Sequence, residues 1–171
     1  LQDSSGTGTP YITGAVLQVK QSILRTTWTS ASSSTAFEDT PLSVSITPQS
    51  TNSKILITGM INNGGNAGSH YDYKVVRNGA DILLSTETMG NKTKSHIHHY
   101  IETAVLSYNI FADSINLLDE PSSTSALTYT LQGGTPNSVS YITYLNRSGR
   151  TNDNAWNAYT VSTLTAMEIG G

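Results

Sequence analysis

The chain contains no cysteine, and charged residues make up only 12% of its 171 positions. The absence of cysteine excludes disulfide bridges, cysteine-ligated zinc or iron–sulfur centres and thiol catalysis. The formal net charge of -3 argues against a nucleic-acid-binding face. No apolar run approaches the roughly 18 residues of a membrane-spanning helix. The fold must therefore rest on apolar burial and backbone pairing.

Small uncharged polar residues are abundant in this chain, whereas charged residues are few. Serine, threonine and asparagine number 23, 24 and 13, which is 60 of the 171 positions. Threonine and tyrosine favour strands, whereas serine and asparagine favour turns over helix interiors. The composition therefore predicts an all-β protein whose solubility depends on hydroxyl and amide groups.

The sequence divides into a short N-terminal arm and one folded domain. Residues 1–13 are rich in serine, glycine and threonine, which is typical of a linker or a docking arm. This segment has no basic stretch followed by an apolar stretch, so no secretory signal is predicted there. Residues 14–171 are long enough for a single domain with its own core.

Within residues 14–171, short apolar or alternating segments follow one another at strand length. We expect strands at 15–19, 42–47, 54–61, 71–77, 80–85, 127–131, 139–145 and 162–169. Asn78-Gly79 is the strongest hairpin signal in the chain. Over 96–109 periodicity does not separate helix from strand, and the β-branched and aromatic residues favour a strand. Residues 62–68, with three asparagines and three glycines, are expected to form a solvent-facing loop.

These segments together predict the fold class. About eight strands in one domain predict an antiparallel two-sheet β-sandwich, jelly-roll-like in arrangement. In the last strand, alternation places Leu164 and Ala166 on one face, with Glu168 at the same parity.

Four histidines, His70, His96, His98 and His99, are the first candidates for chemistry. On a strand His96 and His98 share a face, so they could ligate a metal where several chains meet on a symmetry axis. Two imidazoles alone form an incomplete site, and only Glu102 adds a carboxylate of the same parity. Surface or subunit-contact histidines are the simpler interpretation, and we expect neither a metal nor another cofactor.

The sequence shows no pattern typical of a hydrolase active site. The many serines include no Gly-x-Ser-x-Gly nucleophile elbow, and the acids near the histidines follow no triad order. The carboxylate pairs Glu38-Asp39 and Asp119-Glu120 are adjacent in sequence, so their side chains would point to opposite faces of an extended segment. Turn and edge positions explain both pairs, and we expect the protein not to be an enzyme.

Aromatic residues beside amides are better candidates for a binding surface. Tyrosine and tryptophan rings on loops stack on a partner, while neighbouring asparagine and carboxylate groups contact its hydroxyl groups. For Trp28 and Trp156, core filling is an equally good interpretation. The candidate contact loops are 62–70, 86–99 and 146–159. The candidate residues for contact with a host or partner are Asn63, Asn66, His70, Tyr71, His98, Tyr100, Asn152, Trp156 and Tyr159.

Six groups of segments, in a fixed order, carry a family resemblance. They are 14–19 (GAVLQV), 42–48 (LSVSITP) with 53–57 (SKILI), 77–79 (RNG), 119–121 (DEP) with 125–129 (SALTY), 144–148 (YLNRS) and 162–169 (STLTAMEI). From Gly14 onward the chain resembles a family of virion-surface β-domains of tailed bacteriophages, especially marine and freshwater phages. The resemblance brings no catalytic residues with it, and the histidines at 96–99 lie outside its pattern.

The resemblance implies a structural protein on the surface of the phage particle, often trimeric. The leading expectation is a homotrimeric tail-fibre domain whose strands form a scaffold and whose loops contact the host surface. A capsid decoration (cement) protein, which clamps head subunits and inserts residues 1–13 into the shell, is a close alternative. A lectin-like carbohydrate-binding module or a carbohydrate-active enzyme is a third. The expected partners are copies of the chain, other virion proteins and a host-surface glycan or protein, without nucleic acid or a membrane span.

Overall fold

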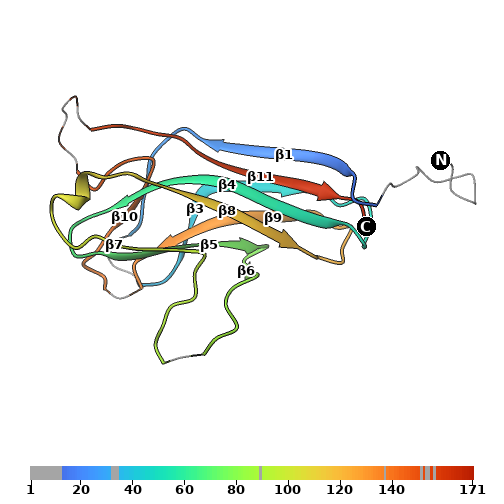
Figure 1. The fold of residues 1–171 in the computed structure, drawn as a ribbon, viewed down its shortest axis with the longest axis horizontal. Helices are drawn as coiled ribbons and strands as arrows, with labels where there is room; N and C mark the ends of the chain where they lie inside the picture. The colour runs from blue at the N-terminus through green and yellow to red at the C-terminus, as the bar shows by residue number, and fades with distance from the viewer. Residues whose placement is uncertain are drawn as a thin grey trace, which may run out of the picture.

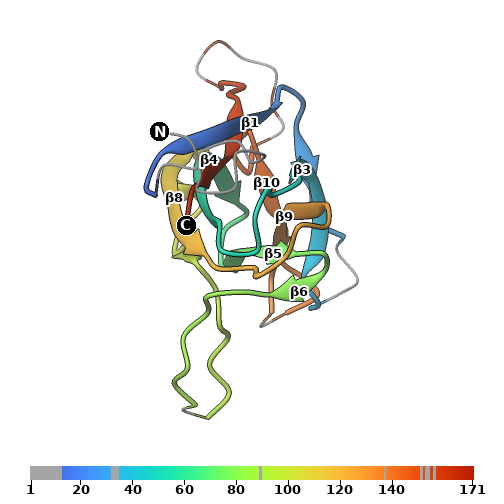
Figure 2. The same cartoon turned by 90° about the vertical axis from the view of Figure 1, so that its right-hand side faces the viewer.

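The structure, a computed structural model, describes residues 13–31, 35–88, 90–136, 138–150, 152, 155 and 157–171. Within these residues the chain forms eleven strands and one short 3-10 helix, η1 (Leu106–Tyr108). The strands form two antiparallel sheets that pack face to face (Figure 1, Figure 2). The predicted antiparallel two-sheet β-sandwich is therefore confirmed.

The first sheet is built around its longest strand, β4. Its members are β1 (Val16–Leu24), β2 (Trp28–Thr29), β4 (Lys54–Gly65), β8 (Phe111–Asp119), β10 (Thr143–Leu145) and β11 (Ser162–Ile169). β8 pairs with one edge of β4, while β11 and then β10 pair with the other edge. β1 extends the sheet beyond β11, and β2 extends it beyond β10.

The second sheet has β3 (Glu38–Ile46), β9 (Leu127–Gly134) and β5 (His70–Arg77) in that order. Two short strands share the far edge of β5: β7 (Ile97–Tyr100) lies beside its first half and β6 (Ala80–Asp81) beside its end. Between β6 and β7, residues 82–88 and 90–96 project away from the sandwich (Figure 1), and we call them the 82–96 loop. This loop and the first half of β5 position the candidate site.

The core lies between the sheets and follows the period-two pattern of the strands. In β11 the residues Leu164, Ala166 and Glu168 are fully buried while their neighbours are partly exposed, as the alternation predicts. Ile57 of β4 is equally inaccessible to solvent. Burying one such aliphatic side chain contributes about 1.5–3 kcal/mol, so the alternating positions hold the sheets together. Trp28 packs against this core, which favours its core-filling interpretation.

A charged side chain, Glu168, belongs to this buried face. Its carboxylate accepts hydrogen bonds from Gln18 Nε2 at 2.6 Å and from the backbone amide of Gln49 at 2.7 Å. Burial alone raises the pKa of this carboxyl group, but the hydrogen bonds to its ionised form outweigh burial and leave the pKa lowered. Gln18 Nε2 also donates to the backbone oxygen of Thr47 at 2.7 Å. The ionised carboxylate therefore joins β11 to β1 and to the segment after β3.

Three tyrosines carry hydroxyl groups into the core. Tyr71 and Tyr73 of β5 and Tyr129 of β9 are fully buried, and burial raises the pKa of each phenol group. The Tyr73 hydroxyl lies 2.6 Å from Thr143 Oγ1 and donates to the backbone oxygen of Tyr144 at 3.0 Å. Because β5 and β10 belong to different sheets, this hydroxyl links the two layers.

The prediction of a loop at 62–68 is wrong for its first four residues, because β4 continues to Gly65. Asn63 and Gly65 pair with β10, and Asn63 also pairs with β8. A Cβ atom on Gly65 would lie 2.7 Å from the Tyr71 ring, so only glycine allows this close approach. Pairing on both edges of β4 thus overrides the turn preference of asparagine and glycine.

Several other boundaries also differ from the expected ones. Residues 96–109, expected as one strand, form only β7 and η1, and β8 has no counterpart among the expected strands. The return strand expected at 80–85 is reduced to β6, and the strand expected at 139–145 begins at Thr143. The Asn78-Gly79 turn is present, with φ values of 50° and 81°, which this dipeptide adopts readily. The structure has eleven strands where about eight are expected, because β2 and β8 have no expected counterpart and β7 forms within 96–109.

Candidate functional site

Two of the predicted contact residues lie in the core. Asn63 and Tyr71 are fully buried, so the prediction that they contact a host or partner is wrong. The Tyr71 hydroxyl donates to Asn63 Oδ1 at 2.9 Å, and Asn63 Nδ2 donates to Asp113 Oδ2 at 2.8 Å. The same oxygen lies 2.8 Å from His99 Nε2. These four side chains form a polar link between the two sheets, which gives Asn63 and Tyr71 a structural role.

The candidates on other loops have different environments. Asn66 is half-buried, and its side-chain oxygen accepts a hydrogen bond from the backbone amide of Ile142, so it fixes a loop. Asn152 is exposed, and Tyr159 is 83% exposed. Trp156 lies outside the described residues. Asn152 and Tyr159 therefore stay candidates for contact with a partner.

The structure brings three of the predicted residues together: His70, His98 and Tyr100. His70 pairs with Tyr100, and Asp72, two residues further along β5, pairs with His98. Because alternate residues of a strand share a face, these side chains project from the outer face of the second sheet. The centroid of the His70 ring lies 4.2 Å from that of Tyr100, in a stacked arrangement, and 5.8 Å from that of His98. We call these three rings the ring ladder.

Asp72 lies beside the ring ladder as a buried carboxylate. Its side chain is 2% exposed, and its Oδ1 accepts a hydrogen bond from Ser95 Oγ at 2.6 Å and lies 3.0 Å from His98 Nδ1. A buried carboxylate needs such partners to offset the loss of its hydration. Asp72 therefore fixes the His98 ring of β7 and Ser95 at the end of the 82–96 loop.

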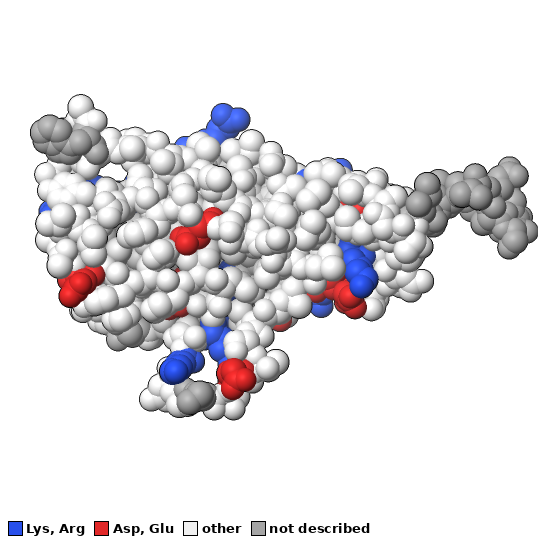
Figure 3. All heavy atoms as spheres, viewed as in Figure 1, with Lys and Arg blue, Asp and Glu red and all other residues white. Residues whose placement is uncertain are grey.

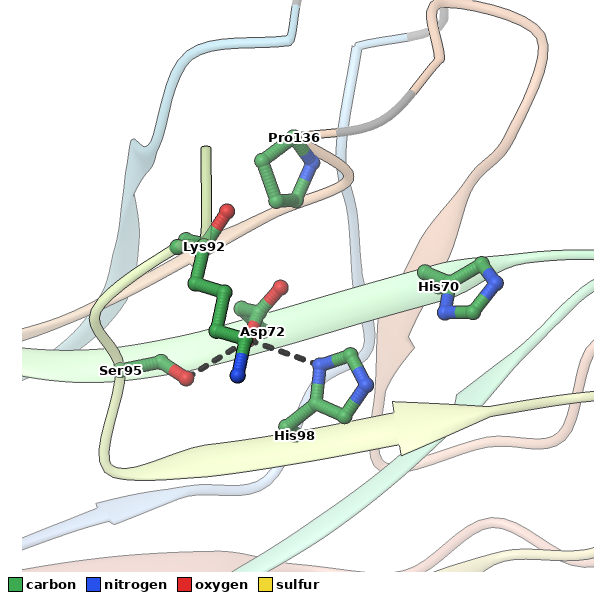
Figure 4. Close-up of a pocket in the computed structure, with 7 residues that line it drawn as sticks. His70, Asp72, Lys92, Ser95, His98 and Pro136 are labelled. Atoms are coloured by element: carbon green, nitrogen blue, oxygen red, sulfur yellow. Dashed lines mark hydrogen bonds and ion pairs between the residues drawn. The ribbon is translucent and has the colours of Figure 1, made fainter. Parts of the chain in front are cut away.

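A pocket of about 390 Å³ opens beside these groups (Figure 4). Its lining comes from four parts of the chain: His70 and Asp72 from β5, His98 from β7, Lys92, Thr93 and Ser95 from the 82–96 loop, and Pro136 from the segment after β9. Figure 4 shows the Lys92 side chain extending from the loop toward Asp72 and His98. Among the described residues, no ion pair to Lys92 is formed. The pocket thus combines a lysine, two imidazoles, two hydroxyl groups and one buried carboxylate.

The sequence predicts His70 and His98 as contact residues and includes Lys92 and Ser95 only as part of the contact loop 86–99, while Asp72 is missed. The shared parity of Asp72 and His70 is a usable signal, since both lie on one face of β5. No local pattern in the sequence predicts that Lys92 and Ser95 lie near β5, because both belong to the long 82–96 loop.

Ser95, His98 and Asp72 do not have the geometry of a serine triad. In a serine triad the hydroxyl group donates to the histidine, and the histidine donates to the carboxylate. Here Ser95 and His98 both turn to the same oxygen of Asp72, so His98 is not placed to take the serine proton. The serine is held as a structural donor.

The carboxylate pair Asp119-Glu120 does not converge on a common cleft. Asp119 is buried and accepts a hydrogen bond from Arg77 at 2.6 Å. Glu120 is exposed and pairs with Lys54, also at 2.6 Å. Each carboxylate thus has its own cationic partner.

The two histidines considered as metal ligands, His96 and His98, have their Nδ1 atoms engaged elsewhere. His96 Nδ1 accepts a hydrogen bond from the Val75 backbone amide at 3.0 Å, and burial lowers the pKa of this imidazole. His98 Nδ1 faces Asp72. Across the described ranges, no group of three or more histidine, aspartate or glutamate side chains could hold a metal ion.

Comparison of the chain with models of known protein families and with curated proteins finds no match. The part of the chain that the structure describes contains no helix long and apolar enough to cross a membrane.

Proposed function

We propose that the chain is a non-enzymatic structural domain of a tailed-bacteriophage virion, located at the particle surface in a tail fibre. In this proposal copies of the chain associate as a homotrimer through the outer face of the first sheet, and the second sheet contacts the host. The family resemblance from Gly14 onward supports the virion assignment. The low charge supports assembly contacts that salt does not screen.

The observation that carries the proposal is an uncharged, partly apolar surface on the first sheet. Strand register arranges its outward residues in rows across β1, β11, β4 and β8. The rows are Val19, Met167, Leu56 and Leu118; Gln21, Thr165, Thr58 and Asn116; and Ile23, Thr163, Met60 and Ser114. We call these residues the first-sheet face. None of them is charged, and Figure 3, which views the molecule from the side of the first sheet, shows charged side chains only at scattered points.

The exposure of the apolar residues on the first-sheet face suits contact with a second copy of the chain. Val19 is 54% exposed, Met60 56% and Leu118 46%. With about 4.8 Å between strands and about 3.3 Å per residue, four strands over about six residues give the face a projected area of about 400 Å². A standard protein–protein interface buries about 800 Å² on each partner, so a stable trimer would also bury residues around the first-sheet face. Association would remove these apolar side chains from water, at about 25 cal/mol per Å² of apolar surface.

The test is the mass of the purified chain in solution, measured by light scattering with residues 1–13 present and removed. We expect a trimer in both cases, because the β-domain itself carries the contact face. Met60→Lys should convert the trimer to a monomer, since it would bury an unpaired charge in the interface. Val105→Lys is the matched control, because Val105 is an apolar residue, 73% exposed, outside the first-sheet face.

Two outcomes would contradict the proposal. A monomer, or a trimer that requires residues 1–13, would favour the capsid decoration protein, which acquires its symmetry on the phage head. A trimer that Met60→Lys leaves intact would mean that another surface holds the copies together.

A further inference from the structure

We propose that the pocket beside the ring ladder binds an acidic saccharide, a sugar unit that carries a carboxylate group. The inference rests on the proposed function in one respect, since it names the host-surface ligand that the second sheet would contact. The ring ladder lies on the outer face of the second sheet, on the opposite side of the sandwich from the first-sheet face. The pocket would therefore stay open in a trimer that forms through the first sheet.

The pocket offers more donor and cationic groups than anionic ones. Lys92 contributes an ammonium group and the His70 imidazole contributes a ring N–H that can donate, whereas the Nδ1 atom of His98 faces Asp72. Asp72, the one carboxylate among the described lining residues, is 2% exposed and already engages Ser95 and His98. An entering ligand therefore meets the charge of Lys92 before that of Asp72. A carboxylate is a group that such a lysine attracts and hydrogen-bonds.

The rest of the lining favours a sugar ring over a bare inorganic anion. Thr93 and Ser95 carry hydroxyl oxygens that can exchange hydrogen bonds with sugar hydroxyl groups. The His98 side chain is 57% exposed, and with Pro136 it offers flat surface to the C–H groups of a sugar. The volume of about 390 Å³ lies within the range of about 300–1,000 Å³ for small-molecule sites and exceeds what a single small anion fills.

The same lining argues for binding without cleavage. Glycoside hydrolysis uses two carboxyl groups that flank the scissile bond. The described lining provides only Asp72, and its Oδ1 is held by two protein partners. An acidic saccharide in this pocket would be held and released unchanged.

The experiment compares two disaccharides that differ by one carboxylate. Cellobiouronic acid (glucuronosyl-glucose) and cellobiose are each titrated into the full chain by calorimetry, with inorganic phosphate as a third probe. We expect cellobiouronic acid to bind about tenfold tighter than cellobiose, the effect of one charge-assisted hydrogen bond. Phosphate should bind no better than cellobiose. Equal binding of the two disaccharides, phosphate binding as tight as that of the acid, or no binding by either disaccharide would overturn the inference.

Two lysines of the 82–96 loop provide matched variants. Lys92→Met removes the charge in the pocket, whereas Lys94→Met makes the same change two residues away, outside the described lining. We expect Lys92→Met to weaken binding of cellobiouronic acid about tenfold and to leave that of cellobiose unchanged. Lys94→Met should behave as the unmodified chain does. Equal losses in the two variants would assign the attraction to overall charge and would also overturn the inference. Both lysines are exposed, so circular dichroism should show an intact fold in both variants.

The failure of the proposed trimer and the failure of the proposed saccharide site can be distinguished by experiment. Light scattering on the same samples reports assembly, while calorimetry reports ligand binding. A trimer that binds neither disaccharide would overturn the saccharide site and leave the structural proposal in place. A monomer that binds cellobiouronic acid would support the site and overturn trimeric assembly.

Discussion

Replacing Glu168 with glutamine tests whether the buried carboxylate stabilises the fold in its ionised form. The substitution keeps the shape of the side chain but turns one acceptor oxygen into an NH2 donor. The Gln49 amide is fixed in the backbone, so the remaining oxygen must serve it. The side-chain amide of Gln18 must then flip to accept from the new NH2 group, and it loses its hydrogen bond to the Thr47 oxygen.

The expected loss of stability follows from this exchange. The Glu168→Gln variant gives up two charge-assisted hydrogen bonds for two neutral ones, and leaves one backbone oxygen without its donor. A hydrogen bond to a charged group contributes about 1.5–3 kcal/mol and a neutral one about 0.5–1.5 kcal/mol. Relief from burying a charge offsets part of the difference. We expect the free energy of unfolding at pH 7 to fall by about 1–2 kcal/mol.

The dependence on pH has a definite sign. The pKa of Glu168 is lower in the folded chain than in the unfolded chain, where it is about 4.3. Its contribution to stability is therefore fully present above about pH 5 and is lost as the pH falls through the lowered pKa of the folded state. The difference in stability between the unmodified chain and Glu168→Gln should be constant from about pH 5 to 7 and should shrink at more acidic pH.

Urea unfolding, followed by circular dichroism at one protein concentration and several pH values, measures this difference. Ser45→Ala is the control, because Ser45 Oγ shares an exposed hydrogen bond with Thr128 Oγ1 in the second sheet, away from the first-sheet face. It should change the unfolding free energy by no more than about 0.5 kcal/mol. The reasoning would be refuted by a Glu168→Gln variant as stable as the control at pH 7, or by a difference that stays constant into acid.

Three other substitutions test separate parts of the fold. Gly65→Ala would place a Cβ atom 2.7 Å from the Tyr71 ring, so it should cost about 1–3 kcal/mol in urea unfolding; a neutral result would mean that β4 can shift at its end. Tyr73→Phe removes the hydroxyl that lies 2.6 Å from Thr143 Oγ1 and should lower the unfolding free energy by about 1–2 kcal/mol, whereas an unchanged value would deny that this hydroxyl links the sheets. Glu120→Gln breaks only an exposed ion pair and should change the melting temperature by about 2 °C or less; a larger loss would show that the pair matters more than its exposure indicates.

The sequence predicts those parts of the fold in which local pattern and tertiary structure agree. Alternation identifies the buried face of β11, and the Asn78-Gly79 dipeptide identifies its turn, because both signals depend on neighbouring residues alone. The end of β4 is misread, since Asn63 and Gly65 have turn preferences that only pairing with β8 and β10 overrides. That pairing joins segments far apart in the chain.

Only part of the candidate site can be predicted from the sequence, because local patterns describe some of its residues and not others. Alternation gives His98 and Tyr100 the same parity, and both side chains lie on one face of β7. Parity alone does not say which face of a strand is buried, so Tyr71 is predicted as a contact residue although it lies in the core. Lys92 reaches the pocket through the path of a loop, which no short-range pattern encodes.

The 82–96 loop begins and ends on the same edge of β5, because β6 and β7 both pair with that edge. The entropic cost of closing a loop grows only slowly with its length. Residues can therefore be added to this loop or removed from it with little loss of stability. Neither sheet would have to change its register, and the first-sheet face lies on the other side of the sandwich. The architecture thus allows the 82–96 loop to change in length and sequence, and with it the ligand preference proposed for the pocket, while the surface proposed to join the copies keeps its sequence.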